Sequence, residues 1–429
     1  MTMQQESMEM EEVEPPLRQE AGTAPASHSG TVPGNTMAAR ESMGSRTAAF
    51  RGRFFSEITD AQWNDWRWQI RNAFETGPDL EKILNLSHDE RAALSLGTGG
   101  FPFLITPYYA SLLDPDDPSH PLRRTVVPVT AEMIHSPGEL QDPLSEDAHT
   151  PVPGLVHRYP DRVLFLVSDF CSTYCRYCTR SRMVGRPGAG RGGTVERWRA
   201  GIEYIESNRQ IRDVVISGGD PLTLSDDRLE WLLTRLRRIP HVEILRIGSK
   251  APVVLPQRIT EPLTRMLKRY HPLWVNLHFT HPEELTEEVR RACEKLADAG
   301  IPLQSQTVLL SGINDRSSTL MELFHGLLRM RVRPYYLFQC DPIVGSGHFR
   351  TSLSTGLSIM KDLRGYTTGF AVPLYVIDTP GGGGKIPVMP ECVMGHDGDT
   401  VLLKNFEGKM YRYRDNAELS HALIDEGVH

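Results

Sequence analysis

The chain has 429 residues, 39% of them hydrophobic and 24% charged, which is typical of a soluble globular protein. A net charge of −7 argues against nucleic acid or a membrane as a partner, and no apolar run is long enough for a transmembrane helix. The acidic start lacks an apolar signal core, and three of the six cysteines cluster together, so we expect a reducing, cytoplasmic setting.

The composition divides the chain into four predicted parts. Residues 1–50 contain almost no aromatic side chains before the end of the segment, which predicts a disordered tail. Residues 51–155 carry apolar side chains at helical spacing and predict an N-terminal helical region. Residues 156–385 are expected to form the core, and residues 386–429 a small extension with a hairpin turning at Glu407-Gly408.

Short apolar runs alternate with amphipathic helices through the third part. Six predicted strands begin at Arg162, Asp213, Val242, Trp274, Gln304 and Tyr335, and a seventh ends at Asp378. This alternation predicts a parallel sheet covered by helices, either a closed or partly closed barrel or an open doubly wound sheet. In each case, ligands bind in the loops that follow the carboxyl ends of the strands.

Three cysteines follow the first predicted strand in the sequence C-S-T-Y-C-R-Y-C, at Cys171, Cys175 and Cys178. Three thiolates can ligate three irons of a four-iron cluster and leave the fourth iron open to a small molecule. Structural zinc is the alternative. It would require a fourth Cys or His nearby, and the sequence directly after the cluster offers none.

The C-x-x-x-C-x-x-C motif after the first strand of a β/α barrel resembles the radical S-adenosylmethionine superfamily. The resemblance implies a partial parallel β/α barrel, in which S-adenosylmethionine binds the open iron and is cleaved on reduction into methionine and a 5′-deoxyadenosyl radical. It also implies contacts to S-adenosylmethionine from Gly218, Gly219 and Asp220 of the G-G-D-P loop and from His278 and Gln306. Taken alone, G-G-D-P also fits an ordinary turn, and a histidine on a strand also fits a packed core.

Lys385 follows four consecutive glycines in the sequence P-G-G-G-G-K-I. A phosphate-binding P-loop is excluded, because that motif requires Gly at position 379 and Ser or Thr at position 386, where the chain has Thr379 and Ile386. A lysine on a flexible glycine arm suits an imine with an aldehyde cofactor, since the side chain must move aside when substrate replaces it. A solvated loop lysine is the alternative.

Together with long stretches of sequence across residues 54–408, these two motifs resemble the lysine 2,3-aminomutase family of radical S-adenosylmethionine enzymes. The resemblance implies that Lys385 carries pyridoxal phosphate. It further implies that Arg158, Tyr159 and Arg162 of the sequence H-R-Y-P-D-R help to hold this cofactor. Two arginines beside a phosphate group are chemically suitable.

The resemblance also implies a basic L-amino acid as substrate. Asp341 and Asp378 match the two carboxylates that receive the far end of the substrate in the lysine enzymes. Arg180 matches the residue that binds the substrate carboxylate, and Asp142 matches one near its amino group. We therefore expect the α-amino group of L-lysine to move to its β-carbon, with L-arginine as the competing substrate because a guanidinium also suits paired carboxylates.

Two rival activities stay open at this point. One is a radical enzyme that acts without pyridoxal phosphate, and the other is a metal-binding module without turnover. We expect an electron donor such as flavodoxin or ferredoxin, and a homo-oligomer. Some family members carry a zinc site that is not expected here, because Arg316 occupies one ligand position and no cysteine follows Cys392.

Overall fold

The computed structural model describes residues 36–95, 102–185, 194–398 and 400–415. Its first element is helix α1 (Thr36–Phe54), so the predicted disordered tail of residues 1–50 is wrong in its last part. The remainder of that tail, residues 1–35, lies outside the described residues. Composition alone does not predict this helix, because tertiary contacts stabilise it. Phe50 packs against the hydrophobic core, and the Thr47 side chain is buried.

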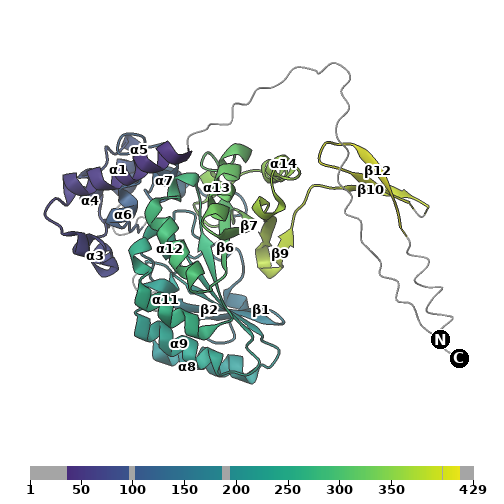
Figure 1. Cartoon of the computed structure of the whole chain (residues 1–429), viewed down its shortest axis with the longest axis horizontal. Helices are drawn as coiled ribbons and strands as arrows, with labels where there is room; N and C mark the ends of the chain where they lie inside the picture. The colour runs from purple at the N-terminus through teal and green to yellow at the C-terminus, as the bar shows by residue number, and fades with distance from the viewer. Residues whose placement is uncertain (1–35, 96–101, 186–193, 399, 416–429) are drawn as a thin grey trace, which may run out of the picture.

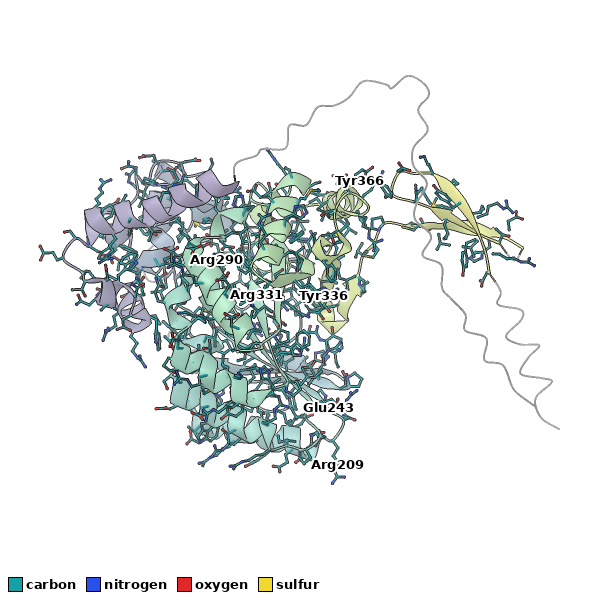
Figure 2. The ribbon with its side chains drawn as sticks, in the orientation of Figure 1. Arg209, Glu243, Arg290, Arg331, Tyr336 and Tyr366 are labelled. Atoms are coloured by element: carbon teal, nitrogen blue, oxygen red, sulfur yellow. The ribbon has the colours of Figure 1, made fainter. Side chains whose placement is uncertain are left out.

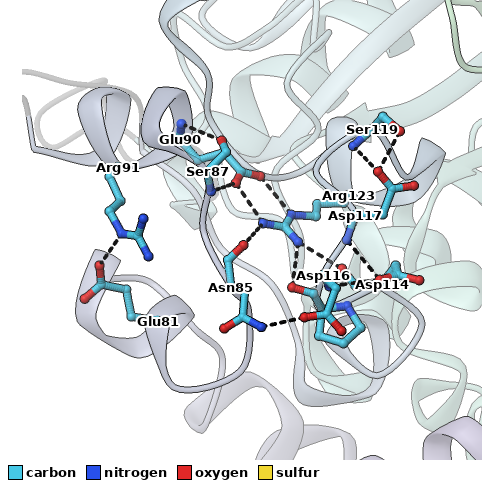
Figure 3. Close-up of polar contacts among 11 residues, drawn as sticks. Glu81, Asn85, Ser87, Glu90, Arg91, Asp114, Asp116, Asp117, Ser119 and Arg123 are labelled. Carbon is cyan, nitrogen blue, oxygen red and sulfur yellow. Dashed lines mark hydrogen bonds and ion pairs between the residues drawn. The ribbon is translucent and has the colours of Figure 1, made fainter.

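The N-terminal region consists of short helices joined by tight loops. They are α2 (Asp60–Trp63), α3 (Trp66–Arg71), α4 (Gly77–Glu81), α5 (His88–Leu94), α6 (Pro107–Ala110), α7 (Pro121–Arg124), η2 (Thr130–Met133) and η3 (Asp147–His149). Thr59 and Ser87 cap α2 and α5 by accepting hydrogen bonds from the first helical turn. The buried Arg123 side chain connects several of these loops. It pairs with Glu90 at 2.7 Å and donates hydrogen bonds to three backbone carbonyls (Figure 3).

A nine-stranded sheet forms the centre of the molecule, with its strands in sequence order. They are β1 (Leu155–Tyr159), β2 (Arg162–Ser168), β3 (Asp213–Gly218), β4 (Ile244–Ser249), β5 (Leu273–His278), β6 (Leu303–Leu309), β7 (Val332–Gln339), β8 (Leu374–Thr379) and β9 (Gly384–Pro387). Strands β2 to β8 are parallel, and they match the seven predicted strands. The predicted partial parallel β/α barrel is thereby confirmed.

Helices cover the outside of this sheet, as Figure 1 shows for α8, α9, α11 and α12. The helices and 3₁₀ turns are α8 (Val195–Ser207), η4 (Pro221–Thr223), α9 (Asp226–Arg237), α10 (Ala251–Val254), η5 (Pro256–Arg258), α11 (Glu261–Leu267), η6 (Lys268–Tyr270), η7 (Pro282–Glu284), α12 (Glu287–Asp298), α13 (Ser317–Arg329), η8 (Gly347–Phe349), α14 (Leu353–Leu363), η9 (Gly369–Ala371) and η10 (Pro380–Gly382). Each longer helix buries one apolar face against the strands. In α9 that face is Leu229, Leu232, Leu233 and Leu236.

The two edge strands, β1 and β9, pair antiparallel to their neighbours and were not predicted. The backbone N–H of Lys385 in β9 donates to the hydroxyl of Tyr159 in β1 at 2.8 Å. This side-chain contact connects the two edges where no strand ladder joins them among the described residues. The barrel is thus partial, and Lys385 lies at its seam.

The C-terminal extension is a three-stranded antiparallel sheet of β10 (Val393–Asp397), β11 (Thr400–Lys404) and β12 (Met410–Arg414), set apart from the barrel in Figure 1. The predicted hairpin corresponds to β11 and β12, with Gly408 at a φ of 81° in the turn. Tyr366, labelled in Figure 2, contacts Phe406 edge-on at 5.3 Å and joins the extension to the end of α14. In the described residues, no helix is both long and apolar enough to cross a membrane.

Candidate active site

The three cysteines lie in the loop after β2 and line one cavity of about 240 Å³. Burial raises the pKa of each thiol, that of Cys178 to about 11. The pKa of Cys171 is raised first by burial and further by the negative charges of Asp220, Cys178 and Cys175, so the three sulfurs lie within electrostatic reach of one another. A bound metal would stabilise the thiolate forms that burial disfavours here.

The donor set of this cavity fits an iron–sulfur cluster better than a single ion. Among the described residues, no group of three His, Cys, Asp or Glu side chains is close enough to hold one metal ion. A four-iron cluster has a different requirement, because each of its corner irons takes its own thiolate. Three cysteines on one cavity wall meet that requirement and leave one corner without a cysteine ligand.

The G-G-D-P loop after β3 packs directly against the start of the cysteine loop. A Cβ atom on Gly218 would lie 2.2 Å from the carbonyl oxygen of Ser168, and one on Gly219 would lie 2.4 Å from that of Phe170. The N–H of Gly219 donates to the Ser168 carbonyl at 2.5 Å. Only glycine allows this approach, so the motif supports the shape of the cysteine loop.

Asp220 has a structural role in this structure. Its carboxylate is 4% exposed and accepts hydrogen bonds from the Leu222 N–H at 3.0 Å, from the Ser249 hydroxyl at 2.8 Å and from the Lys250 N–H at 2.8 Å. These bonds tie the loops after β3 and β4 together beside the cysteines. The predicted contact from Asp220 to S-adenosylmethionine stays a prediction.

A second cavity, of about 360 Å³, lies inside the barrel next to the first. The predicted residues that line it are Arg158, Tyr159, Arg162, Arg180, His278, Gln306, Asp341, Asp378 and Lys385. Arg180 and His278 line both cavities, so the two spaces adjoin. Tyr336, labelled on β7 in Figure 2, also belongs to its wall. The cysteine loop and the glycine-linked lysine therefore face connected parts of one site.

Lys385 is held more rigidly than predicted. It lies in β9 with its backbone paired to that of Asp378, and its ammonium is 2.8 Å and 3.0 Å from the two carboxylate oxygens of Asp378. Gly381, Gly382 and Gly384 adopt φ values of 75°, 88° and 85°, which favour glycine. The glycines thus form a tight turn that returns the chain to the barrel, and the expected flexible arm is replaced by a turn and a strand.

The two predicted carboxylates lie together at the end of the second cavity. Asp378 is 6% exposed, and the Thr179 hydroxyl donates to Asp341 at 2.6 Å. Burial and, less strongly, the charge of Asp378 raise the pKa of Asp341, while the hydrogen bond from Thr179 and the charges of Lys385 and Arg180 lower it, so that the net pKa is about 6. One ammonium, that of Lys385, faces two acids. The pair can therefore accept a second cation.

The lining of this cavity also includes buried polar groups without hydrogen-bond partners among the described residues. The Arg158 Nε is buried and unbonded, while its Nη2 donates to the Leu144 carbonyl. Arg162 is not one of these groups, because it pairs with Asp161 at 3.6 Å and lies 4.0 Å from the centre of the Tyr159 ring. Asn276, which is 1% exposed, has neither of its amide atoms hydrogen-bonded within the described chain. These unsatisfied groups fit a polar, phosphate-bearing cofactor, which would supply the missing acceptors.

Arg180 and Asp142 differ in how well they match their predicted places. Arg180 lines the cavity but pairs with Glu146, at 2.6 Å from Nη2 and 3.2 Å from Nε. Asp142 lines neither cavity and instead caps the turn that contains Glu146. Glu146 was not predicted as a site residue, because no motif marks it and its role depends on a partner 34 positions away.

Comparison with known proteins agrees with this geometry. The family models for the radical SAM superfamily and for lysine-2,3-aminomutase match residues 165–324 and 360–427. An L-lysine 2,3-aminomutase of Clostridium subterminale is 51% identical over 85% of this chain and 87% of its own. The chain belongs to the lysine 2,3-aminomutase family. An L-lysine 2,3-aminomutase of Acetoanaerobium sticklandii is 50% identical over 85% of this chain and 88% of its own length. A glutamate 2,3-aminomutase of Clostridioides difficile is 42% identical over 83% of this chain and 84% of its own length.

Membership of this family confirms the predicted enzyme class and cofactors. The protein is an isomerase of the radical S-adenosylmethionine type that uses a [4Fe-4S] cluster, S-adenosylmethionine and pyridoxal phosphate on a small-molecule substrate. The predicted metal-binding module without turnover and the radical enzyme without pyridoxal phosphate are thereby set aside. Which individual side chains contact each cofactor stays a prediction.

Proposed function

We propose that this enzyme is an L-lysine 2,3-aminomutase that converts L-lysine to L-β-lysine. The observation that carries the substrate assignment is the acid pair Asp341 and Asp378. Asp378 already binds a primary alkylammonium, that of Lys385, at 2.8 Å, and Asp341 is close enough for the charges of Asp378 and Lys385 to affect its pKa. The ε-ammonium of L-lysine is the same chemical group. A carboxylate side chain such as that of glutamate would meet two negative charges here, which is unfavourable.

The chain's own residues position the substrate at both ends. Asp341 and Asp378 bind the distal ammonium, and Arg180 binds the α-carboxylate from the rim shared with the cysteine cavity. Cys171, Cys175 and Cys178 hold the cluster that supplies the radical from S-adenosylmethionine. Bound pyridoxal phosphate supplies a conjugated ring that stabilises the radical during nitrogen migration.

Lys385 and the cavity's arginines hold the second cofactor. Lys385 carries it at the barrel seam, and Arg158 and Arg162, which line the same cavity, neutralise its phosphate. His278 lines both this cavity and the cysteine cavity, and Gln306 lines this one, where the adenosyl group must reach. Burial and the nearby charges of Lys250 and Arg180 lower the pKa of His278 to about 4, so its imidazole is neutral at working pH.

L-Arginine is the second candidate substrate, because its guanidinium can bond to both acids of the pair. A comparison of kcat/KM values for the separate substrates distinguishes the two. The reconstituted enzyme is given L-lysine, L-arginine and L-glutamate in turn with dithionite, S-adenosylmethionine and pyridoxal phosphate, and β-isomers are quantified. We expect L-lysine to give the highest kcat/KM and L-glutamate no product. A higher kcat/KM with L-arginine would reassign the substrate.

Three further features belong to this proposal. Reduction of the cluster requires a low-potential donor, for which flavodoxin or ferredoxin is suited. We propose a reducing, cytoplasmic setting because the three cysteine ligands must stay reduced. We also propose a homo-oligomer that forms without the zinc site of some relatives, since Arg316 occupies a ligand position in this chain.

A further inference from the structure

The Arg180 guanidinium has two edges that can each bind a carboxylate. Its five N–H groups form a planar fork, and the Nε–Nη2 edge is engaged by Glu146 at 3.2 Å and 2.6 Å. Among the described residues, Nη1 forms no hydrogen bond with the chain. Both side chains line the second cavity. The arrangement therefore leaves the Nη1 edge of Arg180 available to a ligand.

The position of Glu146 is itself fixed by its neighbours. The Asp142 carboxylate accepts the N–H of Glu146 at 3.0 Å and that of Asp147 at 2.9 Å. Arg182 pairs with Asp147 at 2.7 Å and with Asp142 at 3.4 Å, and it lies 3.8 Å from Glu146. One turn of backbone is thus held by a carboxylate cap and a single arginine. The Glu146 side chain is 6% exposed, so it has little freedom to move.

We propose that Glu146 is a positioning residue for Arg180, and that Asp142 acts through Glu146 without touching the substrate. The proposal rests on the proposed function, in which Arg180 binds the substrate α-carboxylate. Glu146 fixes the rotation of the guanidinium so that its Nη1 edge faces the cavity. The ion pair of Arg180 and Glu146 carries no net charge. The substrate α-carboxylate is therefore recognised mainly by two directed hydrogen bonds and less by excess positive charge.

The test compares two ligands that differ in the carboxylate alone. L-Lysine and 1,5-diaminopentane are titrated by calorimetry into enzyme loaded with cluster, S-adenosylmethionine and pyridoxal phosphate, without reductant. The preference is the ratio of the two Kd values. We expect Glu146→Gln to reduce that preference by about 10-fold or more, since a charged hydrogen bond is lost, while the Kd of the diamine changes by less than about 2-fold. Asp142→Asn changes the preference in the same direction by less.

Arg180→Ala serves as the reference variant, because it removes the group that binds the carboxylate. The positioning role is overturned if Arg180→Ala abolishes the preference but Glu146→Gln either leaves it unchanged or weakens the binding of both ligands equally. In that case the proposed function stands. If Arg180→Ala itself leaves the preference intact, the assignment of Arg180 fails and the inference fails with it. Should Glu146→Gln not fold, Glu146→Asp replaces it, because the shorter acid cannot reach both nitrogens; a loss of preference is again expected.

Discussion

Asp341 is the residue at which burial and substrate recognition conflict most directly. Burial and the charge of Asp378 raise its pKa to about 6, whereas an unfolded aspartate titrates near 3.9. The folded state therefore binds the proton more tightly, and this group's contribution to stability falls as the pH rises from about 4 to about 6. Above that range, the ionised form costs about 2–3 kcal/mol of folding free energy. A bound substrate ammonium offsets this cost.

Replacing Asp341 with Asn is expected to stabilise the cofactor-free protein and to weaken substrate binding. At pH 7.5 the variant loses the buried charge, so its melting temperature rises by about 3 °C or more above the wild type, for about 2 kcal/mol of stabilisation. The difference shrinks as the pH approaches 4, where the carboxyl of the folded wild type is protonated and no longer a buried charge. Thermal unfolding across this pH range measures the effect. Glu391→Gln, which neutralises an exposed acid, is the control, and an increase for Asp341→Asn that does not depend on pH would contradict the account.

At the scale of elements, the parallel strands could be predicted because each is a continuous apolar run between turn signals. The edge strands could not. β1 contains polar residues of the H-R-Y motif, and β9 has only four residues after a glycine run, so neither has a strand pattern of its own. Both form because a neighbouring strand offers an unpaired edge. The pairing of Arg180 with Glu146 and the capping of the Glu146 turn by Asp142 were likewise hidden, since they depend on a turn and on partners distant in sequence.

The packing of the G-G-D-P loop on the cysteine loop gives a prediction at this scale. In Gly219→Ala, the added Cβ would lie 2.4 Å from the Phe170 carbonyl, so the cysteine loop must shift. We expect the iron content after anaerobic reconstitution to fall by about half or more, because a site displaced by about 1 Å binds poorly. Gly369→Ala is the matched control, since its Cβ would meet no atom within 4 Å. Equal iron content in both variants would refute this role of the loop.

At the scale of the whole molecule, the N-terminal helices cover the barrel and reach the cysteine loop. Arg176 of that loop pairs with Glu132 at 2.6 Å, and both side chains are buried. Tyr109 donates to the buried Glu284 of the barrel at 2.8 Å. The fold therefore supports the cluster site from two sides. Sequence patterns predicted the two parts but not these contacts, which depend on residue pairs far apart in the chain.

The buried ion pair between Arg123 and Glu90 gives a prediction about the stability of the N-terminal region. Arg123 is 0% exposed, so Glu90→Gln leaves a cation uncompensated in the interior (Figure 3). We expect it to lower the free energy of unfolding by about 3–5 kcal/mol. Glu81→Gln removes the exposed pair with Arg91 and is expected to cost less than about 1 kcal/mol. Denaturant unfolding compares them, and similar losses in the two variants would contradict the prediction.

The central claim is that the cysteine loop and Lys385 face one connected cavity, in which a radical forms beside the β-carbon of a bound basic amino acid. The most direct measurement follows an isotope. L-Lysine deuterated at the β-carbon is incubated with the reconstituted enzyme, dithionite, S-adenosylmethionine and pyridoxal phosphate. The account predicts β-lysine with deuterium at its α-carbon and deuterium in the 5′ position of recovered S-adenosylmethionine. β-Lysine that forms without deuterium reaching S-adenosylmethionine, or no β-lysine at all, would contradict it.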